Sequence, residues 1–311
     1  MENVLVLLST YNGEKYLREQ LNSIIAQEEV NFHILVRDDG SNDATIKILE
    51  EYQANFGKIT IMEGQNVGAA LSFYNLLLKA DSCLDNFDYY AFADQDDYWF
   101  PRKLIESVTL LNKQSAYYKL YYGKVTATNS KLEPIETVKI MPSTSLASNI
   151  VSSRALGCTM VFNRNLLHKA CVISEYLNKK SKTDYIPYHD GWMSLVAYSL
   201  GGAVVVGKEP LMFYRQHEHN AVGTGKNVFG LIKARFIRYL KSEKTKSKKC
   251  QIVLGLLGNE IPTQNKNLLC LCAYYSQSLK KRIQLACRKD LYEYGLIDNI
   301  GTFGVIILNK F

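Results

Sequence analysis

The chain has 311 residues, of which 47% are hydrophobic and 22% are charged. This apolar share is enough to bury a core, so it excludes an intrinsically disordered chain, and the length suits one large domain with a smaller addition. No stretch approaches the roughly 18–20 apolar residues that span a bilayer, and no basic segment precedes the first apolar residues. We therefore expect neither an integral membrane protein nor a secretory signal.

The basic charge is concentrated in one segment. The net charge is +7, but the segment from Lys226 to Cys250 alone contains nine basic residues and one acidic residue. Its residues 229–240 place apolar side chains on one helical face with basic side chains around it, which favours an interfacial helix on an anionic membrane surface. The alternative is a solvated linker. No aromatic and basic platform repeats, so we expect no nucleic-acid partner.

The cysteine pattern indicates a redox compartment. Seven cysteines are present, and none forms a CxxC pair. This pattern is typical of reduced thiols in a cytosolic protein rather than of a zinc site or a disulfide framework.

The first 130 residues alternate short buried strands with amphipathic helices. The strands are expected at Val4–Leu8, Phe32–Val36, Ile59–Met62 and Tyr89–Ala93, and the helices at Lys15–Ala26, Thr45–Tyr52 and Ala69–Lys79. This alternation predicts an α/β fold with a doubly wound, mostly parallel sheet. Ligands of such sheets bind beyond the carboxyl ends of the strands.

The pattern changes after Tyr117. Strands are expected at Leu120–Thr128, Gly157–Phe162, Ala203–Val206 and Leu211–Tyr214, helices at Arg164–Ile173, His189–Leu200 and Asn267–Tyr294, and a polar loop at Ser143–Ser153. We expect two domains: 1–225 is the α/β domain, and 226–311 is a basic, amphipathic and mainly helical C-terminal extension.

Two adjacent carboxylates, Asp38 and Asp39, follow the second strand. A turn with a helix cap explains the next residues, Gly40, Ser41 and Asp43, but not the carboxylate pair. Like charges at the end of a buried strand repel each other unless a ligand or a cation uses them. A carboxylate here could accept a hydrogen bond from the imide N–H of a uracil or thymine ring.

Three carboxylates, Asp94, Asp96 and Asp97, follow the fourth strand. In an extended segment Asp94 and Asp96 point to the same side, so both can reach one ligand. Mg²⁺ and Mn²⁺ favour one or two carboxylates together with substrate phosphate oxygens. A cap on the next helix, which Pro101 opens, would explain Asp97 alone.

These segments together resemble the inverting glycosyltransferases of family 2, which have a GT-A fold. The resemblance runs from residue 4 to about residue 225. It rests on Ser9–Gly13, Asp38–Ser41, Asn66–Gly68, Ala93–Asp97, Trp99 and Pro101, in this order and spacing.

The resemblance implies a nucleotide site and a metal site. The residues implied to contact the nucleotide are Thr10, Tyr11, Asp38, Asp39, Asn66, Gly68 and Asp94. Asp94 and Asp96, with His217 as a further candidate, would hold a divalent metal, Mg²⁺ or Mn²⁺, at the donor diphosphate.

The resemblance also implies a catalytic base. Asp190, in the segment Tyr188–Trp192, matches the position of the family's base, and the alternative is a cap on the following helix. The segment Tyr214–Gly223 is similar to one in rhamnosyltransferase-like members. Candidates for the diphosphate or the acceptor are Arg215, Trp192, Gly157 and Cys158.

The sequence is thus identified as a single-addition, inverting, metal-dependent hexosyltransferase. The resemblance implies dTDP-L-rhamnose as the first candidate donor and a UDP-hexose as the second. The acceptor would be a polyprenyl-diphosphate-linked glycan in capsule, O-antigen or cell-wall synthesis. The enzyme would be cytoplasmic and peripheral on the inner face of the bacterial plasma membrane. The alternative that is no enzyme is a nucleotide-sugar-binding module; no oligomeric state is predicted.

Overall fold

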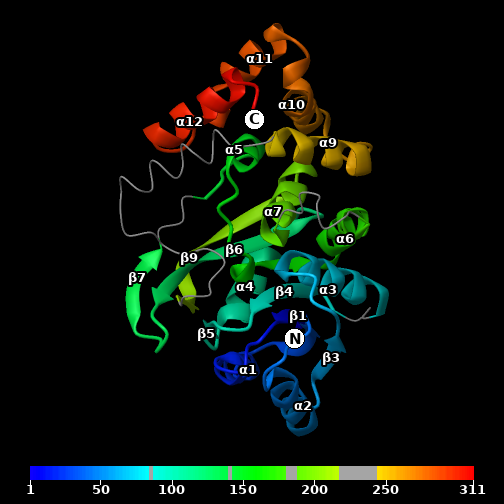
Figure 1. Ribbon diagram of the computed structural model, residues 1–311, viewed down its shortest axis with the longest axis vertical. Coiled ribbons are helices and arrows are strands. Elements are labelled where there is room, and N and C mark those ends of the chain that lie inside the picture. Colours follow the sequence, from blue (N-terminus) through cyan, green and yellow to red (C-terminus); the bar gives the residue numbers. More distant parts are fainter. Residues whose placement is uncertain (84–86, 139–141, 180–187, 217–243) are drawn as a thin grey trace. The chain divides into compact units, whose positions relative to one another are not determined.

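The computed structural model describes residues 1–83, 87–138, 142–179, 188–216 and 244–311 (Figure 1). The chain divides into two compact units, which are described separately. The first lies within Met1–Ile140, Ala155–Ala197 and Gly202–His217, and the second within Met141–Arg154, Tyr198–Gly201 and Glu218–Phe311. The predicted domain boundary at residue 225 falls outside the described residues and stays a prediction.

The first unit is built on one mixed sheet. Its strands are β1 (Asn3–Thr10), β2 (Asn31–Asp38), β3 (Ile59–Glu63), β4 (Tyr89–Asp94), β5 (Tyr98–Trp99), β6 (Lys119–Thr128), β7 (Pro134–Val138), β8 (Val161–Asn163) and β9 (Ala203–Arg215). Their order is β3-β2-β1-β4-β8-β6-β9-β5, and β7 pairs with β6. The strands β1 to β4 are parallel to their neighbours among themselves, and β8 runs antiparallel between β4 and β6.

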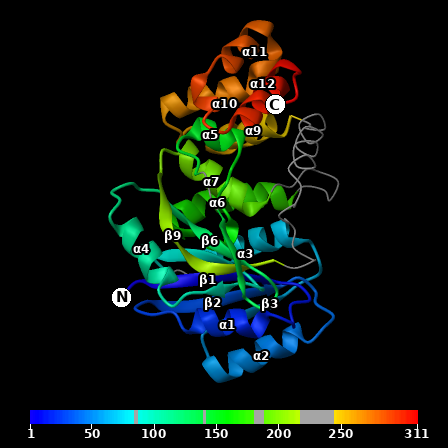
Figure 2. The same cartoon turned by 90° about the vertical axis from the view of Figure 1, so that its left-hand side faces the viewer.

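Helices cover both faces of this sheet, as the alternating sequence pattern predicts. α1 (Leu17–Ile25) and α2 (Thr45–Phe56) lie on one face, and α3 (Ala69–Cys83) and α6 (Arg164–Asn178) lie on the other (Figures 1 and 2). Every residue from Val4 to Leu8 in β1 is fully buried because the strand is covered on both sides. The predicted α/β doubly wound fold is therefore confirmed.

Two predicted strands differ from the structure. Ala203–Val206 and Leu211–Tyr214 belong to one strand, β9, whose pairing with β6 shifts register twice, so the intervening polar residues stay within the strand. The predicted strand Gly157–Phe162 begins instead with a 3₁₀ turn, η1 (Gly157–Thr159), and only its end forms β8.

The second unit is helical. Its elements are α5 (Leu146–Val151), α9 (Thr245–Leu257), α10 (Thr263–Tyr274), η2 (Tyr275–Gln277), α11 (Leu279–Ala286), η3 (Lys289–Leu291) and α12 (Leu296–Ile307). α7 (His189–Ser199) starts in the first unit and ends in the second. The long helix predicted at Asn267–Tyr294 is therefore broken into α10, α11 and two 3₁₀ turns.

The prediction of a loop at Ser143–Ser153 is wrong. Ser145 and Ser148 form a reciprocal capping box that starts α5. The hydroxyl of Tyr294 donates to the carbonyl oxygens of Ser148 (3.0 Å) and Ser152 (2.9 Å), which anchors the short helix. These serines read as loop formers in the sequence because their cap and their distant partner are not visible there.

The predicted membrane segment 229–249 is only partly described. Residues 229–243 lie outside the described residues, whereas 244–249 lead into α9, where Ser247 is buried. Burial also lowers the pKa of Lys246 to about 8, so this part of the lysine-rich stretch belongs to a folded helix. Among the described residues, no helix combines the length and apolarity needed to cross a bilayer.

Candidate active site

The predicted site residues meet at the carboxyl edge of three parallel strands. Thr10 at the end of β1 pairs in register with Asp38 at the end of β2, and Ser9 pairs with Asp94 at the end of β4. Segments far apart in the sequence are thus brought to one edge, which is where ligands of doubly wound sheets bind.

Asp38 organises the turn that follows β2. Its Oδ1 accepts hydrogen bonds from the hydroxyls of Thr10 (3.0 Å) and Ser41 (2.5 Å). Its Oδ2 accepts from the backbone N–H groups of Gly40 (3.0 Å) and Ser41 (2.7 Å). Gly40 has φ +81°, a conformation that glycine adopts without strain. Four donors therefore stabilise this buried carboxylate within the protein.

Asp39 holds the segment that contains Asn66 and Gly68. Its Oδ1 accepts from Arg37 Nη1 (2.5 Å) and from the Val67 N–H (2.9 Å), and its Oδ2 accepts from the Gly68 N–H (2.8 Å). The repulsion within the carboxylate pair is therefore offset by Arg37 and backbone N–H donors, and the prediction that a ligand or a cation is needed for this is wrong. The nucleoside contacts of these residues remain predictions that rest on the family resemblance.

Gln95 is a positioning residue that the sequence analysis missed. Its Oε1 accepts from the Tyr11 N–H (2.8 Å), and its Nε2 donates to the Tyr11 carbonyl oxygen (3.0 Å). A Cβ atom at Gly13 would lie 2.3 Å from Gln95 Oε1, so glycine leaves room for this link. The loop after β1 is thereby tied to the loop after β4, with the Tyr11 side chain 44% exposed.

The three carboxylates after β4 differ in exposure. Asp94 and Asp96 are partly exposed, whereas Asp97 is fully buried. Asp97 Oδ1 accepts from the Arg215 N–H (3.3 Å). Asp97 does not cap the next helix, α4 (Lys103–Asn112), whose N-cap residue is Arg102, without a side-chain cap. The cap explanation of Asp97 is therefore wrong, and its partner is in β9.

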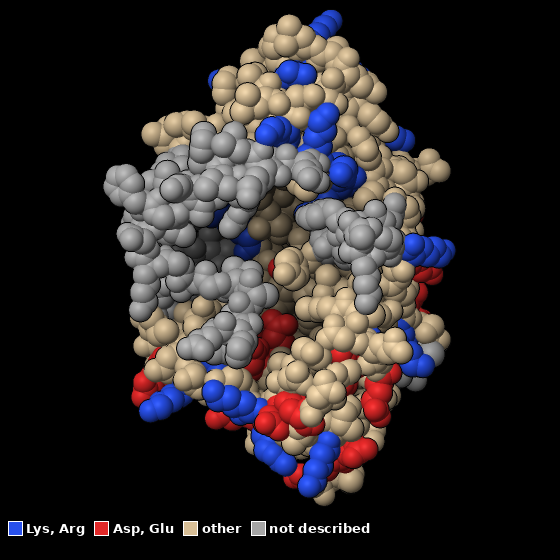
Figure 3. Space-filling model, in the orientation of Figure 1, with Lys and Arg blue, Asp and Glu red and all other residues tan. Residues whose placement is uncertain are grey.

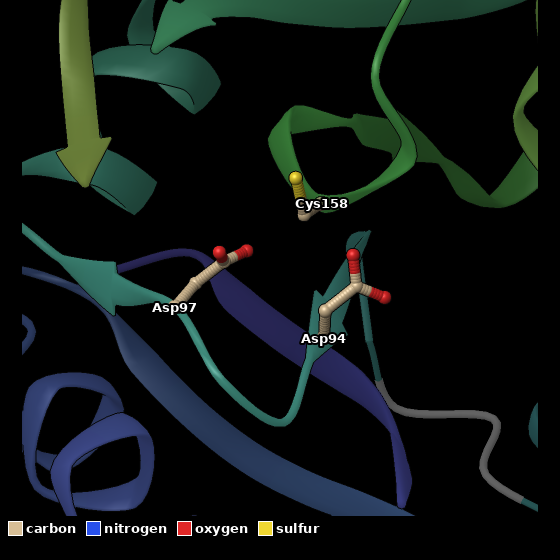
Figure 4. Close-up of side chains that lie close together, drawn as sticks. All are labelled: Asp94, Asp97 and Cys158. Atoms are coloured by element: carbon tan, nitrogen blue, oxygen red, sulfur yellow. The ribbon is translucent and has the colours of Figure 1, made fainter. Parts of the chain in front are cut away.

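Asp94 and Asp97 form a tight cluster with Cys158 (Figure 4). One ligand atom of each lies within 4.8 Å of the others. Behind them the buried Lys103 Nζ lies 3.2 Å from the centroid of the Trp99 ring, and burial lowers its pKa to about 7. Burial raises the pKa of the Cys158 thiol, which keeps it protonated.

The residues around Asp94 fit a hard divalent cation. Burial, then the carboxylates of Asp96 and Asp190, raise the pKa of Asp94 to about 7. A cation would offset this crowding of negative charge. Mg²⁺ and Mn²⁺ take carboxylate oxygens, and a protonated thiol suits neither, so Asp94 and the partly exposed Asp96 are the candidate ligands rather than Cys158. The third predicted ligand, His217, lies outside the described residues.

Asp190 is the second residue of α7. Its charge contributes to the raised pKa of Asp94, so its carboxylate lies near the acidic loop after β4. The positive end of the helix dipole favours a carboxylate in this first turn. The Gly191 N–H donates to Asp190 Oδ1 (2.5 Å) within α7, which starts at His189 rather than after Asp190. The structure thus brings the predicted base within electrostatic range of Asp94, one of the predicted metal ligands.

The buried ring of His189 leaves room only for a glycine at position 157. Its ring packs against Phe73 and Phe92, with centroids 3.8 Å and 4.6 Å away. A Cβ atom at Gly157 would lie 2.4 Å from His189 Nε2, so a larger residue would displace the imidazole. Gly157 is buried and acts here through close packing. Burial lowers the pKa of His189 to about 3.

This depressed pKa predicts a pH-dependent stability. The unfolded chain binds a proton at His189 below the ordinary pKa of about 6.5, but the folded protein does so only near 3. Stability is therefore lost as the pH falls from about 6.5 towards 3. When the pH is lowered from about 6 to about 4, the free energy of unfolding of both proteins is compared. That of wild type should fall by about 1.4 kcal/mol per pH unit more than that of His189→Leu. Urea unfolding at several pH values measures both slopes, and equal slopes would contradict the prediction.

Two further candidates are buried. The Trp192 side chain is 2% exposed, and that of Arg215 is 1% exposed. Arg215 Nε donates to the Asp96 carbonyl oxygen (2.8 Å), Nη1 donates to that of Ser130 (2.5 Å), and Nη2 pairs with Glu19. These contacts hold the backbone of the acidic loop, so Arg215 acts in this structure as a positioning residue. Its predicted contact with the diphosphate is not supported by this geometry.

Replacing Arg215 should therefore destabilise the protein. Arg215→Lys leaves buried carbonyl oxygens without their donors, which costs about 2–4 kcal/mol in the free energy of unfolding. The matched control is Arg18→Lys, which alters the exposed bidentate pair with Glu51 and should cost less than about 1 kcal/mol. Urea unfolding measures the free energy of unfolding of both variants. Equal losses would show that the contacts of Arg215 stabilise the protein no more than an exposed ion pair does.

Comparisons with known sequences identify the family. A family model described as Glycosyl transferase family 2 matches residues 5–170. The dTDP-rhamnosyl transferase RfbG of Shigella flexneri is 33% identical over 221 residues, which cover 70% of this chain and 73% of RfbG. The uncharacterized protein Rv1520 of Mycobacterium tuberculosis is 26% identical over 222 residues, 68% of this chain and 58% of Rv1520. The chain therefore spans less than two thirds of that second relative.

Solved structures show the same fold. TarS 1-349 of S. aureus, in complex with UDP-GlcNAc, has a TM-score of 0.56 and 16% identity, covering 99% of this chain and 91% of that one. The mannosyltransferase PcManGT from Pyrobaculum calidifontis, in complex with GDP-Man and Mn²⁺, has a TM-score of 0.50 and 16% identity, covering 98% and 84%. These likenesses concern the GT-A fold alone. With the family model and RfbG beside them, the chain belongs to glycosyltransferase family 2.

Proposed function

We propose that this enzyme transfers L-rhamnose from dTDP-L-rhamnose, with inversion, to a hydroxyl of a polyprenyl-diphosphate-linked glycan. The observation that carries the donor is the 33% identity to RfbG, a dTDP-rhamnosyl transferase. The reaction would serve capsule, O-antigen or cell-wall polysaccharide synthesis at the inner face of the bacterial plasma membrane. Residues 229–249 would bind the anionic membrane surface, as their sequence pattern predicts.

The nucleotide would bind beyond the ends of β1, β2 and β4. Three of the proposed contacts, Tyr11, Asn66 and Gly68, are exposed and can meet a ligand directly. Three others, Thr10, Asp38 and Asp39, are buried: the Thr10 hydroxyl donates to Asp38, and Asp39 accepts from the Gly68 N–H. The seventh, Asp94, is partly exposed. We infer that the buried residues set the shape of the site for the nucleobase and the ribose. We also infer that the nucleobase forms a hydrogen bond to the protein through its edge.

The chemistry proposed is a single displacement at the anomeric carbon. Asp190 accepts the proton of the acceptor hydroxyl as that oxygen attacks, an effect worth about 10²–10⁴-fold in rate. Asp94 and Asp96 would hold a divalent cation, Mg²⁺ or Mn²⁺, which would supply Lewis-acid stabilisation of the negative charge on the leaving diphosphate. The pKa of Asp94, raised by burial and by Asp96 and Asp190, supports this assignment because the crowded charges favour a cation.

A panel of nucleotide sugars tests the donor. Thermal unfolding is measured with dTDP-L-rhamnose, UDP-glucose, UDP-galactose and UDP-GlcNAc, each with Mg²⁺ or Mn²⁺. A donor present at about 100 times its dissociation constant stabilises the folded state by about 2.7 kcal/mol, so we expect the largest shift with dTDP-L-rhamnose. A larger shift with a UDP-hexose would overturn the donor assignment. Binding without metal-stimulated donor hydrolysis would indicate a binding module without turnover.

A further inference from the structure

The C-terminal helices carry an apolar face that the first unit's chemistry does not use. Its large side chains are between 40% and 75% exposed and belong to α11 and α12: Leu279, Ile283, Leu296, Ile300, Phe303 and Ile307. We refer to these six residues as the C-terminal apolar face. Single exposed apolar side chains are ordinary, but a contiguous set on adjacent helices is typical of an interaction surface.

The spacing of these residues puts them on one side of each helix. In α12 they recur at intervals of four, three and four residues, and in α11 at an interval of four, which is the period of one helical face. α11 and α12 lie side by side in both views, and Arg282 of α11 donates to the Ile307 carbonyl oxygen (3.3 Å) of α12 (Figures 1 and 2). Each of these two neighbouring helices of the second unit therefore has an exposed apolar stripe.

The opposite side of α12 already contains the residues that pack inward. Thr302 and Ile306 are fully buried, and Val305 is 2% exposed. The helix is therefore apolar on two sides, whereas a helix on a water-exposed surface needs only one apolar side, the one that packs against the core. The outward side has an apolar character that folding of the described residues does not account for.

The C-terminal segment that contains this face has a positive net charge. Between residues 244 and 311 the chain has eleven Lys or Arg residues and four Asp or Glu residues. Asp290 pairs with Arg288 (2.5 Å) and Asp298 pairs with Arg154 (2.9 Å), so two of the acids and one of the eleven basic residues are in ion pairs within the unit. On the side of the molecule seen in Figure 3, Lys and Arg side chains appear over α9, α10 and α11 with no Asp or Glu among them. Next to the apolar face itself stand the successive residues Lys280 and Lys281.

We propose that the C-terminal apolar face inserts into an anionic lipid bilayer. Apolar side chains flanked by lysines match the boundary between acyl chains and negatively charged headgroups. A protein partner would also bury an apolar face, but the excess of positive charge favours a negatively charged surface. This surface is distinct from residues 229–249, and its action does not depend on which sugar the enzyme transfers.

Vesicle sedimentation tests the proposal with the full chain. Wild type should sediment with vesicles of phosphatidylcholine and phosphatidylglycerol and much less with phosphatidylcholine alone. The double variant Ile300→Gln/Phe303→Gln should bind the anionic vesicles about tenfold more weakly or worse, because two apolar side chains no longer enter the bilayer. The matched control is Ile135→Gln in β7, where an isoleucine of similar exposure should be dispensable. Equal binding by the double variant and wild type would overturn the proposal.

A fluorescent reporter checks insertion directly. Both native tryptophans, Trp99 and Trp192, are buried, so their emission should change little on binding. In Phe303→Trp the introduced indole should shift its emission to shorter wavelength when anionic vesicles are added. An unshifted emission on vesicle-bound protein would show that the face stays in water, and would overturn the proposal.

Other occupants of the face give different results. If a second copy of the chain covers it, wild type self-associates without lipid, and Ile300→Gln/Phe303→Gln abolishes this. If another part of the chain covers it, the double variant lowers the melting temperature of the lipid-free protein by clearly more than the roughly 2 °C expected for exposed positions. If Arg235→Gln/Arg238→Gln abolishes vesicle binding and the double variant leaves it intact, residues 229–249 alone dock. Each of these outcomes overturns the proposal. Donor binding is measured in a separate experiment. The proposed donor can therefore be rejected while the proposed bilayer surface is still supported.

Discussion

Asp190→Asn is expected to lower the turnover number by about 10²–10⁴-fold and to leave donor affinity nearly unchanged. The amide has the same size as the carboxylate but cannot accept the acceptor's proton. The side chain lies near Asp94 in the first turn of α7, so the substitution also removes one of the charges that raise the pKa of Asp94. Donor and metal binding should therefore be retained or slightly altered, while chemistry is lost. Steady-state kinetics and calorimetric titration with the donor measure the two effects.

The control for this variant is Asp88→Asn. Asp88 is an exposed aspartate whose Oδ2 accepts from the Asn3 N–H (3.0 Å), outside the site. It should keep wild-type turnover. Near-normal turnover of Asp190→Asn on the true acceptor would reject Asp190 as the base. Loss of donor binding together with turnover would instead point to a role in shaping the donor site.

Asp96→Asn should lower turnover by about 10²–10³-fold and should also weaken Mn²⁺ binding. Asp96 is partly exposed, and its charge helps to raise the pKa of Asp94, so it is placed to share a cation with that residue. Removing it also relieves repulsion between neighbouring carboxylates, so the free energy of unfolding without metal should stay the same or rise. Weaker Mn²⁺ binding together with unchanged or higher stability identifies Asp96 as a metal ligand rather than a residue that only supports the fold.

Titration of Mn²⁺ by electron paramagnetic resonance, with and without nucleotide, measures the binding, and urea unfolding measures the stability. Asp88→Asn is again the control and should change neither. Wild-type Mn²⁺ affinity in Asp96→Asn would reject the assignment. A loss of stability comparable to that of Arg215→Lys would assign Asp96 to the structural network around the acidic loop instead.

The first half of the sheet could be predicted from the sequence because its signals are local. Val4–Leu8 is a continuous apolar run, and Phe32–Val36 is apolar except for His33, as is typical of strands buried on both faces. Amphipathic helices between them leave a parallel sheet as the arrangement that buries every apolar side. The positions of Asp38, Asp39 and Asp94 at strand ends follow from the same pattern.

The second half depended on partners that are distant in the sequence. Ser143–Ser153 is rich in serine, yet part of it forms α5, which the capping box of Ser145 and Ser148 starts and Tyr294 anchors at its carbonyl oxygens. The two short apolar runs within Ala203–Arg215 are one strand because β6 pairs with it through two register shifts. The anchoring by Tyr294 and the pairing with β6 leave no local trace, since both depend on long-range hydrogen bonds.

By itself the sequence determined which chemical groups stand at the carboxyl edge of the sheet, and where the positive charge is concentrated. Patterning and charge are properties of the chain alone, and they indicated the acidic loop after β4 without coordinates, whereas Asp190 was indicated only by the family resemblance. Only the tertiary structure decided what those groups contact. It paired Asp39 with the N–H groups of Val67 and Gly68, held the Asp96 backbone on Arg215 and placed Asp97 inside the protein. A buried charge takes whichever partner the packing brings within reach, and packing is set by segments that lie far apart in the sequence.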